Sequence, residues 1–189
     1  CHLTFNGLYD QVDQVITRAR DAGVDRMISV ATTPQDGQQA AALANRFEGV
    51  YATVGVHPHY ADQWQDRKAV DDAIVSLTQH PHVIAVGEMG LDRHYPDPPI
   101  DQQNRVFEWQ LQAVANLPNP LPMIIHNREA TDQTIAIIGD SGLPGERFVF
   151  HCFTGNDQEL DQILEIGAMI SFTGIVTFKN SQALAACAK

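Results

Sequence analysis

The chain has 189 residues, 44% of them hydrophobic, which is enough for one sizeable core and within the usual length of a single domain. Its 12 Lys and Arg residues against 23 Asp and Glu residues give a net charge of -11 at pH 7. This balance argues against capture of nucleic acid by a basic surface, because such binding depends on cations neutralising phosphates, although a metal site could reverse the field locally.

Neither a run of about 18 apolar residues nor a signal-peptide pattern occurs in the sequence, so we expect no membrane span. The three cysteines, Cys1, Cys152 and Cys187, are odd in number and contain no CxxC pair. This usage fits a reducing, cytoplasmic setting. Residues 1–3 read as the end of an apolar strand, so we expect a clipped first strand.

The first half of the chain alternates helical spacing with short apolar stretches. Residues 8–22 place Leu8, Val12 and Ile16 on one helical face, and Gly23 follows at a position where helices commonly end. The pattern then predicts, in order, a strand at 26–31, a helix at 35–47, a strand at 50–56 and a helix at 69–78.

The same alternation continues through the second half. It predicts, in order, a strand at 83–88, a helix at 101–115, a strand at 122–126, a helix at 131–139, a strand at 147–151, a helix at 157–166, a strand at 168–172 and a short helix from Ser181. No linker rich in Gly, Ser or Pro interrupts this pattern, so we expect one domain over residues 1–189.

Alternating strands and helices predict an α/β fold built from right-handed parallel βαβ units. Either an open doubly wound sheet or a TIM-type (β/α)8 barrel would satisfy the pattern. Two observations favour the barrel: no phosphate-binding glycine motif follows any strand, and polar residues recur at the carboxyl ends of strands all along the chain. In an open sheet they would gather at one switch point.

Three of these strand ends carry metal-binding residue types. Glu88, His126 and His151 each follow an apolar run directly. In a parallel barrel such ends share one rim, so a carboxylate and two imidazoles can converge on a divalent ion. The ion would activate water, which makes hydrolysis the default chemistry, with Glu88 as the catalytic residue. Any one of the three could instead end its strand by chance or serve the core.

Two histidine positions offer further candidates near the same rim. His2 follows an apolar strand end and is a candidate fourth ligand, although a frayed terminal residue would look the same. His57 and His59 flank Pro58 after another strand, where a purely structural turn is the alternative. We favour contact with substrate at the rim for His57 over metal ligation.

Three charged residues lie just past strand ends. Asp92 is a candidate for orienting a ligand, Arg128 for holding a phosphate, and Lys179 for neutralising a leaving group. Ordinary salt bridges within loops are the alternative for each.

Six motifs occur in order along the chain: CHL (1–3), VGVHPH (54–59), GEMGLD (87–92), IHNR (125–128), FHCFTG (150–155) and SFTGI (171–175). Their order and their spread over essentially the whole chain resemble the TatD family of metal-dependent deoxyribonucleases, within the amidohydrolase-like barrel superfamily. The resemblance implies two divalent ions, with Zn, Mg or Mn as candidates, that activate water to cleave phosphodiester bonds. The implied substrate is DNA, which the acidic surface restricts to single-stranded ends.

The resemblance also implies roles for individual residues. Glu88 would bridge the two ions, His126 and His151 would complete one site, and His2 would belong to a His-x-His pair that holds the other. The first His of that pair would precede Cys1, and a later Glu-Thr-Asp block with the eighth strand and its helix would follow Lys189. We therefore expect an incomplete barrel with an unpaired edge and weak or no activity.

Two other functions remain open on the same fold. A metal-dependent hydrolase of amides or esters would use the same barrel mouth. An inactive barrel that binds a partner through its rim would retain the fold without the metal.

Overall fold

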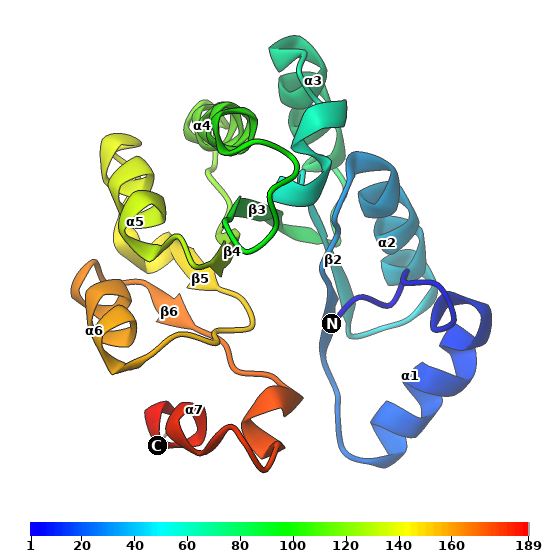
Figure 1. Cartoon of the computed structure of the whole chain (residues 1–189). Helices are drawn as coiled ribbons and strands as arrows, with labels where there is room; N and C mark the ends of the chain where they lie inside the picture. The colour runs from blue at the N-terminus through cyan, green and yellow to red at the C-terminus, as the bar shows by residue number, and fades with distance from the viewer. Residues whose placement is uncertain (189) are drawn as a thin grey trace.

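A computed structural model describes residues 1–188. Six parallel strands form one sheet in chain order, β1-β2-β3-β4-β5-β6. The sheet curls into a half-barrel with helices around its outer side, and the open side lies between α1 and α7 (Figure 1). The strands are β1 (Met27–Ser29), β2 (Val50–Val54), β3 (Val83–Asp92), β4 (Met123–Arg128), β5 (Phe148–Phe150) and β6 (Met169–Ile170). The predicted fold class, an incomplete TIM-type barrel, is confirmed.

A helix after each of the strands β1 to β5 returns the chain to the start of the next strand, while α1 precedes β1 and α7 follows β6. The helices are α1 (Val12–Asp21), α2 (Pro34–Arg46), α3 (Arg67–Leu77), α4 (Ile100–Ala115), α5 (Thr131–Asp140), α6 (Asp157–Glu165) and α7 (Gln182–Cys187). Four 3-10 turns are η1 (Tyr9–Gln11), η2 (Pro58–Gln63), η3 (Gly145–Arg147) and η4 (Gly174–Thr177). None of the helices within residues 1–188 has both the length and the apolar character that a membrane span requires.

Local sequence signals explain where the helices begin. The Thr33 side chain accepts a hydrogen bond from the Asp36 amide at the start of α2, and Pro34 occupies the first turn, where its missing N–H has no cost. Asn156 and Glu159 form a reciprocal capping box at the start of α6. These caps satisfy amide groups that have no partner inside the helix.

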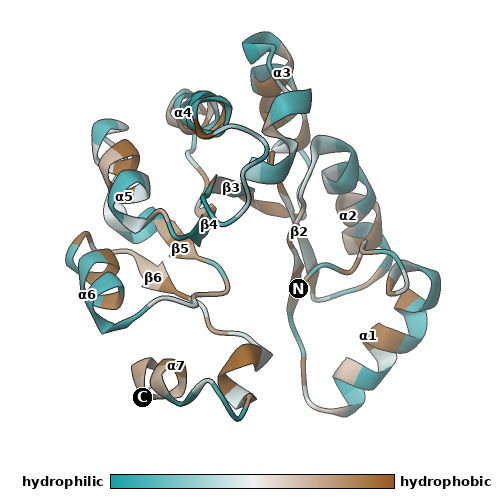
Figure 2. Ribbon diagram, in the orientation of Figure 1, coloured by the Kyte–Doolittle hydropathy of each residue, from teal (hydrophilic) through white to brown (hydrophobic). Residues whose placement is uncertain are grey.

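The core lies between the sheet and the inner faces of the helices. Hydrophobic residues concentrate on the strands, while the helices carry mixed hydrophobic and hydrophilic faces (Figure 2). The largest fully buried side chains include Phe107 and Leu111 of α4 together with Phe148 and Phe150 of β5. The central strand β3 is buried along nearly its whole length, which explains its near-continuous apolar run, whereas Ile28 of β1 and Met169 of β6 are exposed.

Most element boundaries lie within a few residues of those that the sequence predicts, and two of the differences affect the site. Strand β3 continues to Asp92 rather than ending at Glu88, because residues from Met89 to Asp92 pair in register with β4. Residues 1–3 form no strand, but the Cys1 carbonyl accepts from the Val30 amide at 2.7 Å and the Cys1 nitrogen donates to the Ile28 carbonyl at 3.2 Å. The beginning of the chain therefore lies alongside β1.

Strand β3 passes so close to β4 that two of its positions need glycine. A Cβ on Gly87 would lie 2.3 Å from the Ile124 carbonyl oxygen, and one on Gly90 would lie 2.1 Å from the His126 carbonyl oxygen. Both glycines also have a positive φ, +140° and +137° respectively. Any other residue would therefore be strained there and would push β4 away.

We predict that Gly90→Ala lowers the free energy of unfolding by at least about 2 kcal/mol, the combined cost of backbone strain and overpacking. Chemical denaturation followed by circular dichroism measures this change. Gly139→Ala is the matched control, because a Cβ on that exposed glycine of α5 would meet nothing within 4 Å. The control should be neutral or more stable by up to about 1 kcal/mol. Equal stability of the two variants would contradict the close approach.

Candidate metal centre

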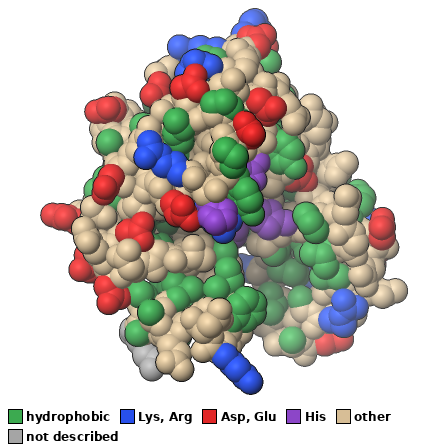
Figure 3. Space-filling view, in the orientation of Figure 1, with side chains coloured by type: hydrophobic (Ala, Val, Ile, Leu, Met, Phe, Trp, Pro, Cys, Tyr) green, Lys and Arg blue, Asp and Glu red, His purple; other side chains and the backbone are tan. Residues whose placement is uncertain are grey.

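The carboxyl ends of β3, β4 and β5 meet at one rim of the half-barrel. Glu88 lies within β3, His126 within β4, and His151 directly after β5. All three line a cavity of about 710 Å³, together with His2 and His57. Histidine side chains gather near the centre of this face, beside a hollow between hydrophobic side chains (Figure 3). The structure thus brings the three main predicted residues to one cavity.

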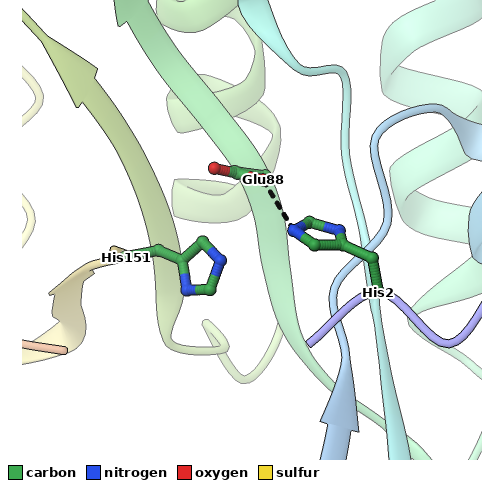
Figure 4. Close-up of side chains that lie close together, drawn as sticks. All are labelled: His2, Glu88 and His151. Carbon is green, nitrogen blue, oxygen red and sulfur yellow. Dashed lines mark ion pairs between the residues drawn. The ribbon is translucent and has the colours of Figure 1, made fainter. Parts of the chain in front are cut away.

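Glu88 is the centre of this arrangement. Its side chain is almost fully buried, and its Oε1 lies 3.1 Å from His126 Nδ1 and 4.0 Å from His57 Nε2. Its other oxygen, Oε2, lies 3.8 Å from His2 Nε2. The rings of His2 and His151 lie side by side next to Glu88 in the close-up view, with their centroids 5.6 Å apart (Figure 4). One carboxylate therefore presents a separate oxygen to each of two groups of imidazoles.

Two groups of three donors share this carboxylate. His2, Glu88 and His151 form one group, and His57, Glu88 and His126 form the other, with the donor atoms of each group all within 4.8 Å of one another. Nitrogen and oxygen ligands bind zinc and similar ions at about 2.0–2.2 Å, so donors of one ion lie up to about 4.4 Å apart. The donor types of both groups suit a divalent ion, and the spacing of the donors is close to this limit. The groups pair His151 with His2 rather than with His126.

The scaffold fixes one nitrogen of three of these imidazoles and leaves the other facing Glu88. His2 Nδ1 contacts the Val30 carbonyl oxygen at 2.7 Å. His57 Nδ1 accepts from the His59 amide at 3.1 Å. His126 Nε2 lies 2.9 Å from Asp92 Oδ2. An oxygen partner that accepts from one ring nitrogen leaves the lone pair on the other, so His2 and His126 present a lone pair near Glu88. His57 accepts at Nδ1 and so carries its proton on Nε2. An ion at His57 Nε2 would need that proton to move to Nδ1, which would end the bond from the His59 amide.

The electrostatics keep Glu88 ionised. Burial alone would raise its pKa, but the hydrogen bond from His126 and the nearby imidazoles lower the pKa to about 2. Burial, with the neighbouring His126, lowers the pKa of His57 to about 3, and burial also lowers the pKa of His151. A carboxylate and two neutral imidazoles are the protonation states that metal ligands need.

His126 responds differently because it contacts two carboxylates. Burial lowers its pKa, but the hydrogen bonds to Asp92 and Glu88 raise the pKa to about 9. Asp92 is itself 1% exposed and also lies 3.1 Å from His59 Nε2. It therefore acts as a buried anchor for imidazoles that line the cavity.

The family model described as TatD related DNase matches residues 1–189, the whole chain. The chain belongs to the TatD family. A protein from Citrobacter koseri named 3'-5' ssDNA/RNA exonuclease TatD is 38% identical over 179 residues, which cover 93% of this chain and 66% of that protein. A protein of the same name from Salmonella typhimurium is 37% identical over the same shares.

Solved structures of TatD proteins share the fold. A TatD homologue from Escherichia coli superposes with a TM-score of 0.87 at 26% identity, over 99% of this chain and 71% of that one. A TatD family hydrolase from Entamoeba histolytica gives a TM-score of 0.81 at 24% identity, over 92% of this chain and 63% of that one. The chain spans just under two thirds of the length of the curated relatives it matches.

The three candidate substrate-binding residues, His57, Arg128 and Lys179, lie in different places relative to the cavity. His57 is buried within the second donor group rather than at the outer rim. Arg128, at the end of β4, lines the cavity. Lys179 is exposed on the turn after η4 and is not among the described residues that line the cavity. The substrate-binding roles of these residues stay predictions.

Two glutamines of α4 support the site and were not singled out from the sequence. Gln103 accepts from the Asp92 amide at 2.8 Å and donates to the Asp92 carbonyl at 3.0 Å. Gln110 makes the same pair of bonds with Val56, at 2.7 Å and 3.0 Å. Both glutamines occupy the apolar face of α4, with Phe107 and Leu111. A polar side chain on the apolar face of a helix needs a hydrogen-bond partner once it is buried, so the two glutamines were the sequence signal for this support.

We predict that Asp92→Asn weakens divalent metal binding by about 10- to 100-fold, because the buried charge that orients His126 is lost. Titration calorimetry with Mn²⁺ or Zn²⁺ measures the affinity, and circular dichroism checks the fold. Asp101→Asn is the control, because that carboxylate forms an exposed ion pair with Arg105 at 3.4 Å. An unchanged affinity in Asp92→Asn would show that Asp92 does not support the centre.

Proposed function

We propose that this chain is part of a divalent-metal-dependent nuclease that cleaves phosphodiester bonds at single-stranded nucleic acid ends. The observation that carries the proposal is the buried Glu88 carboxylate, shared by two three-donor groups at the mouth of a cavity. The TatD relatives from Citrobacter koseri and Salmonella typhimurium are named as single-strand exonucleases. Their names support the choice of substrate.

We further propose that the ligands are His2, Glu88 and His151 for one ion, and His57, Glu88 and His126 for a second. Two imidazoles in each group favour Zn²⁺ or Mn²⁺ over Mg²⁺, which prefers oxygen ligands. Bound there, divalent ions would activate water and stabilise charge on the phosphoryl oxygens. Glu88 is the catalytic residue, because without it both groups lose a donor.

Arg128 is the residue of the cavity best suited to hold the substrate. Arg128 lines the cavity and can donate to a non-bridging phosphate oxygen. A cavity of about 710 Å³ encloses a group of small-molecule size, which favours a strand end. The net charge of -11 repels long duplex DNA from the rest of the surface. Attraction for phosphate is thereby concentrated at the metal centre and Arg128.

We predict that Glu88→Gln lowers kcat/KM for a short single-stranded DNA by about 100-fold or more, the loss of roughly 3 kcal/mol of transition-state stabilisation. The assay uses the chain and a version extended at both ends with the matching segments of the Citrobacter koseri relative. Activity should need Mn²⁺ or Zn²⁺ and disappear with a chelator. Glu108→Gln, an exposed position on α4, is the matched control and should retain full activity.

Other outcomes distinguish the alternative functions. Cleavage of simple esters or amides but not of DNA, with metal bound, would replace the nuclease proposal with another hydrolase. Absence of any bound metal from the extended protein would support an inactive barrel that binds a partner.

A further inference from the structure

An exposed aromatic ring stands at the edge of the metal-centre cavity. Tyr95 is 48% exposed, although large aromatic side chains usually contribute most when buried. Its ring centroid lies 5.2 Å from that of His59. His59 lines both the metal-centre cavity and an adjoining hollow formed with Tyr95, Pro96 and Asp97. The Tyr95 ring is therefore next to the place where the reacting phosphate would lie.

The chain holds this ring in place from several sides. The Tyr95 and His94 amides both donate to Asp92 Oδ1, at 3.3 Å and 2.9 Å. The His94 ring packs edge-on with Tyr95 at 4.8 Å between centroids and is tied to Glu129 Oε1 at 2.8 Å. Asp92 also orients His126, so the position of the Tyr95 ring is coupled to that of the metal-binding imidazoles. These contacts fix the backbone at Tyr95 and place its ring edge-on against His94.

The guanidinium of Arg128 completes the arrangement, with its Cζ 5.4 Å from the centre of the Tyr95 ring. Arg128 is the one Lys or Arg among the described residues that line the cavity. A phosphate can bind the guanidinium while a flat ring stacks against the tyrosine or the guanidinium plane. An aromatic ring beside a cation can hold one nucleotide, through stacking on its base and a charge contact with its phosphate.

The acidic surface makes the stacking contact more important. Most proteins that hold single strands combine a basic groove with aromatic platforms, and the net charge of -11 leaves little of the first. Stacking on an aromatic ring works for any base, since every base has a π face. It also needs a base whose face is free, which a paired base inside a duplex does not offer.

On the basis of the proposed nuclease function, we propose that Tyr95 is the stacking platform for an unpaired base of the nucleotide adjoining the scissile phosphate. Arg128 binds the phosphate of the same nucleotide. Tyr95 thereby selects single-stranded ends without regard to base sequence. The competing explanation is that Tyr95 merely positions Arg128 and never touches a base.

A scan with abasic substrates separates the two explanations. Six-nucleotide single strands carry one abasic residue at each position in turn, and kcat/KM and the dissociation constant are measured with Mn²⁺ for the extended protein. We expect one position near the cleaved end to lose about 5- to 100-fold, the usual value of one base–aromatic stack. Tyr95→Ala should show a similar loss on intact DNA and no further loss at that abasic position.

Conservative and distant variants provide the controls. Tyr95→Phe and Tyr95→Trp should retain both activity and the abasic penalty, because they keep the ring. Tyr9→Ala should change nothing, since that 40% exposed tyrosine of η1 lies outside the cavity lining. An abasic penalty that persists at full size in Tyr95→Ala would overturn the proposal. The proposal would also be overturned if Tyr95→Ala lowered the activity on a strand without any bases, because that loss would show a positioning role.

The same experiment tests the nuclease function separately. Wild-type protein that cleaves neither intact nor base-free strands would refute the nuclease function. The binding arm would still decide the question of Tyr95, since base-dependent affinity does not require cleavage. Equal affinity of the wild type and Tyr95→Ala for intact strands would overturn the inference even if cleavage occurs.

Discussion

One buried carboxylate organises the functional end of this protein. Removing an ionised carboxylate from water is costly unless hydrogen bonds or cations compensate it. Glu88 is 4% exposed, and the described residues around it are His2, His57, His126 and His151, which are imidazoles rather than a permanent cation. Without an ion, His126 supplies positive charge, because its contacts with Asp92 and Glu88 raise its pKa to about 9. A divalent ion in each donor group would replace that charge, so the burial of Glu88 suits a metal site.

The rest of the fold positions and orients those imidazoles around Glu88. Parallel strands bring their carboxyl ends to one rim, and glycines allow β3 to lie close enough to β4 for His126 to reach Glu88. A second set of contacts then fixes the rings, through the Val30 carbonyl, the His59 amide and Asp92. Preorganisation of this kind reduces the ordering cost when an ion or a substrate binds.

Most of the fold and the centre of the site can be predicted from the sequence, because both depend on local patterns. Apolar runs ending in Glu88, His126 and His151 are visible in the chain itself. The sequence predicts Asp92 just past a strand that ends at Glu88, whereas β3 continues through the buried Met89 and Leu91, which pair with β4, to Asp92. The support from Gln103 and Gln110 depends on tertiary hydrogen bonds between α4 and strand ends, which no local pattern reports.

The central claim is that Glu88 is shared by two metal ions, and anomalous diffraction from crystals soaked in Mn²⁺ tests it most directly. The account predicts two peaks about 3.5–4 Å apart, each within about 2.0–2.3 Å of a different Glu88 oxygen. One peak should contact His2 and His151, and the other His57 and His126. Manganese bound elsewhere, with Glu88 contacting no ion in a protein that still cleaves DNA, would contradict the account.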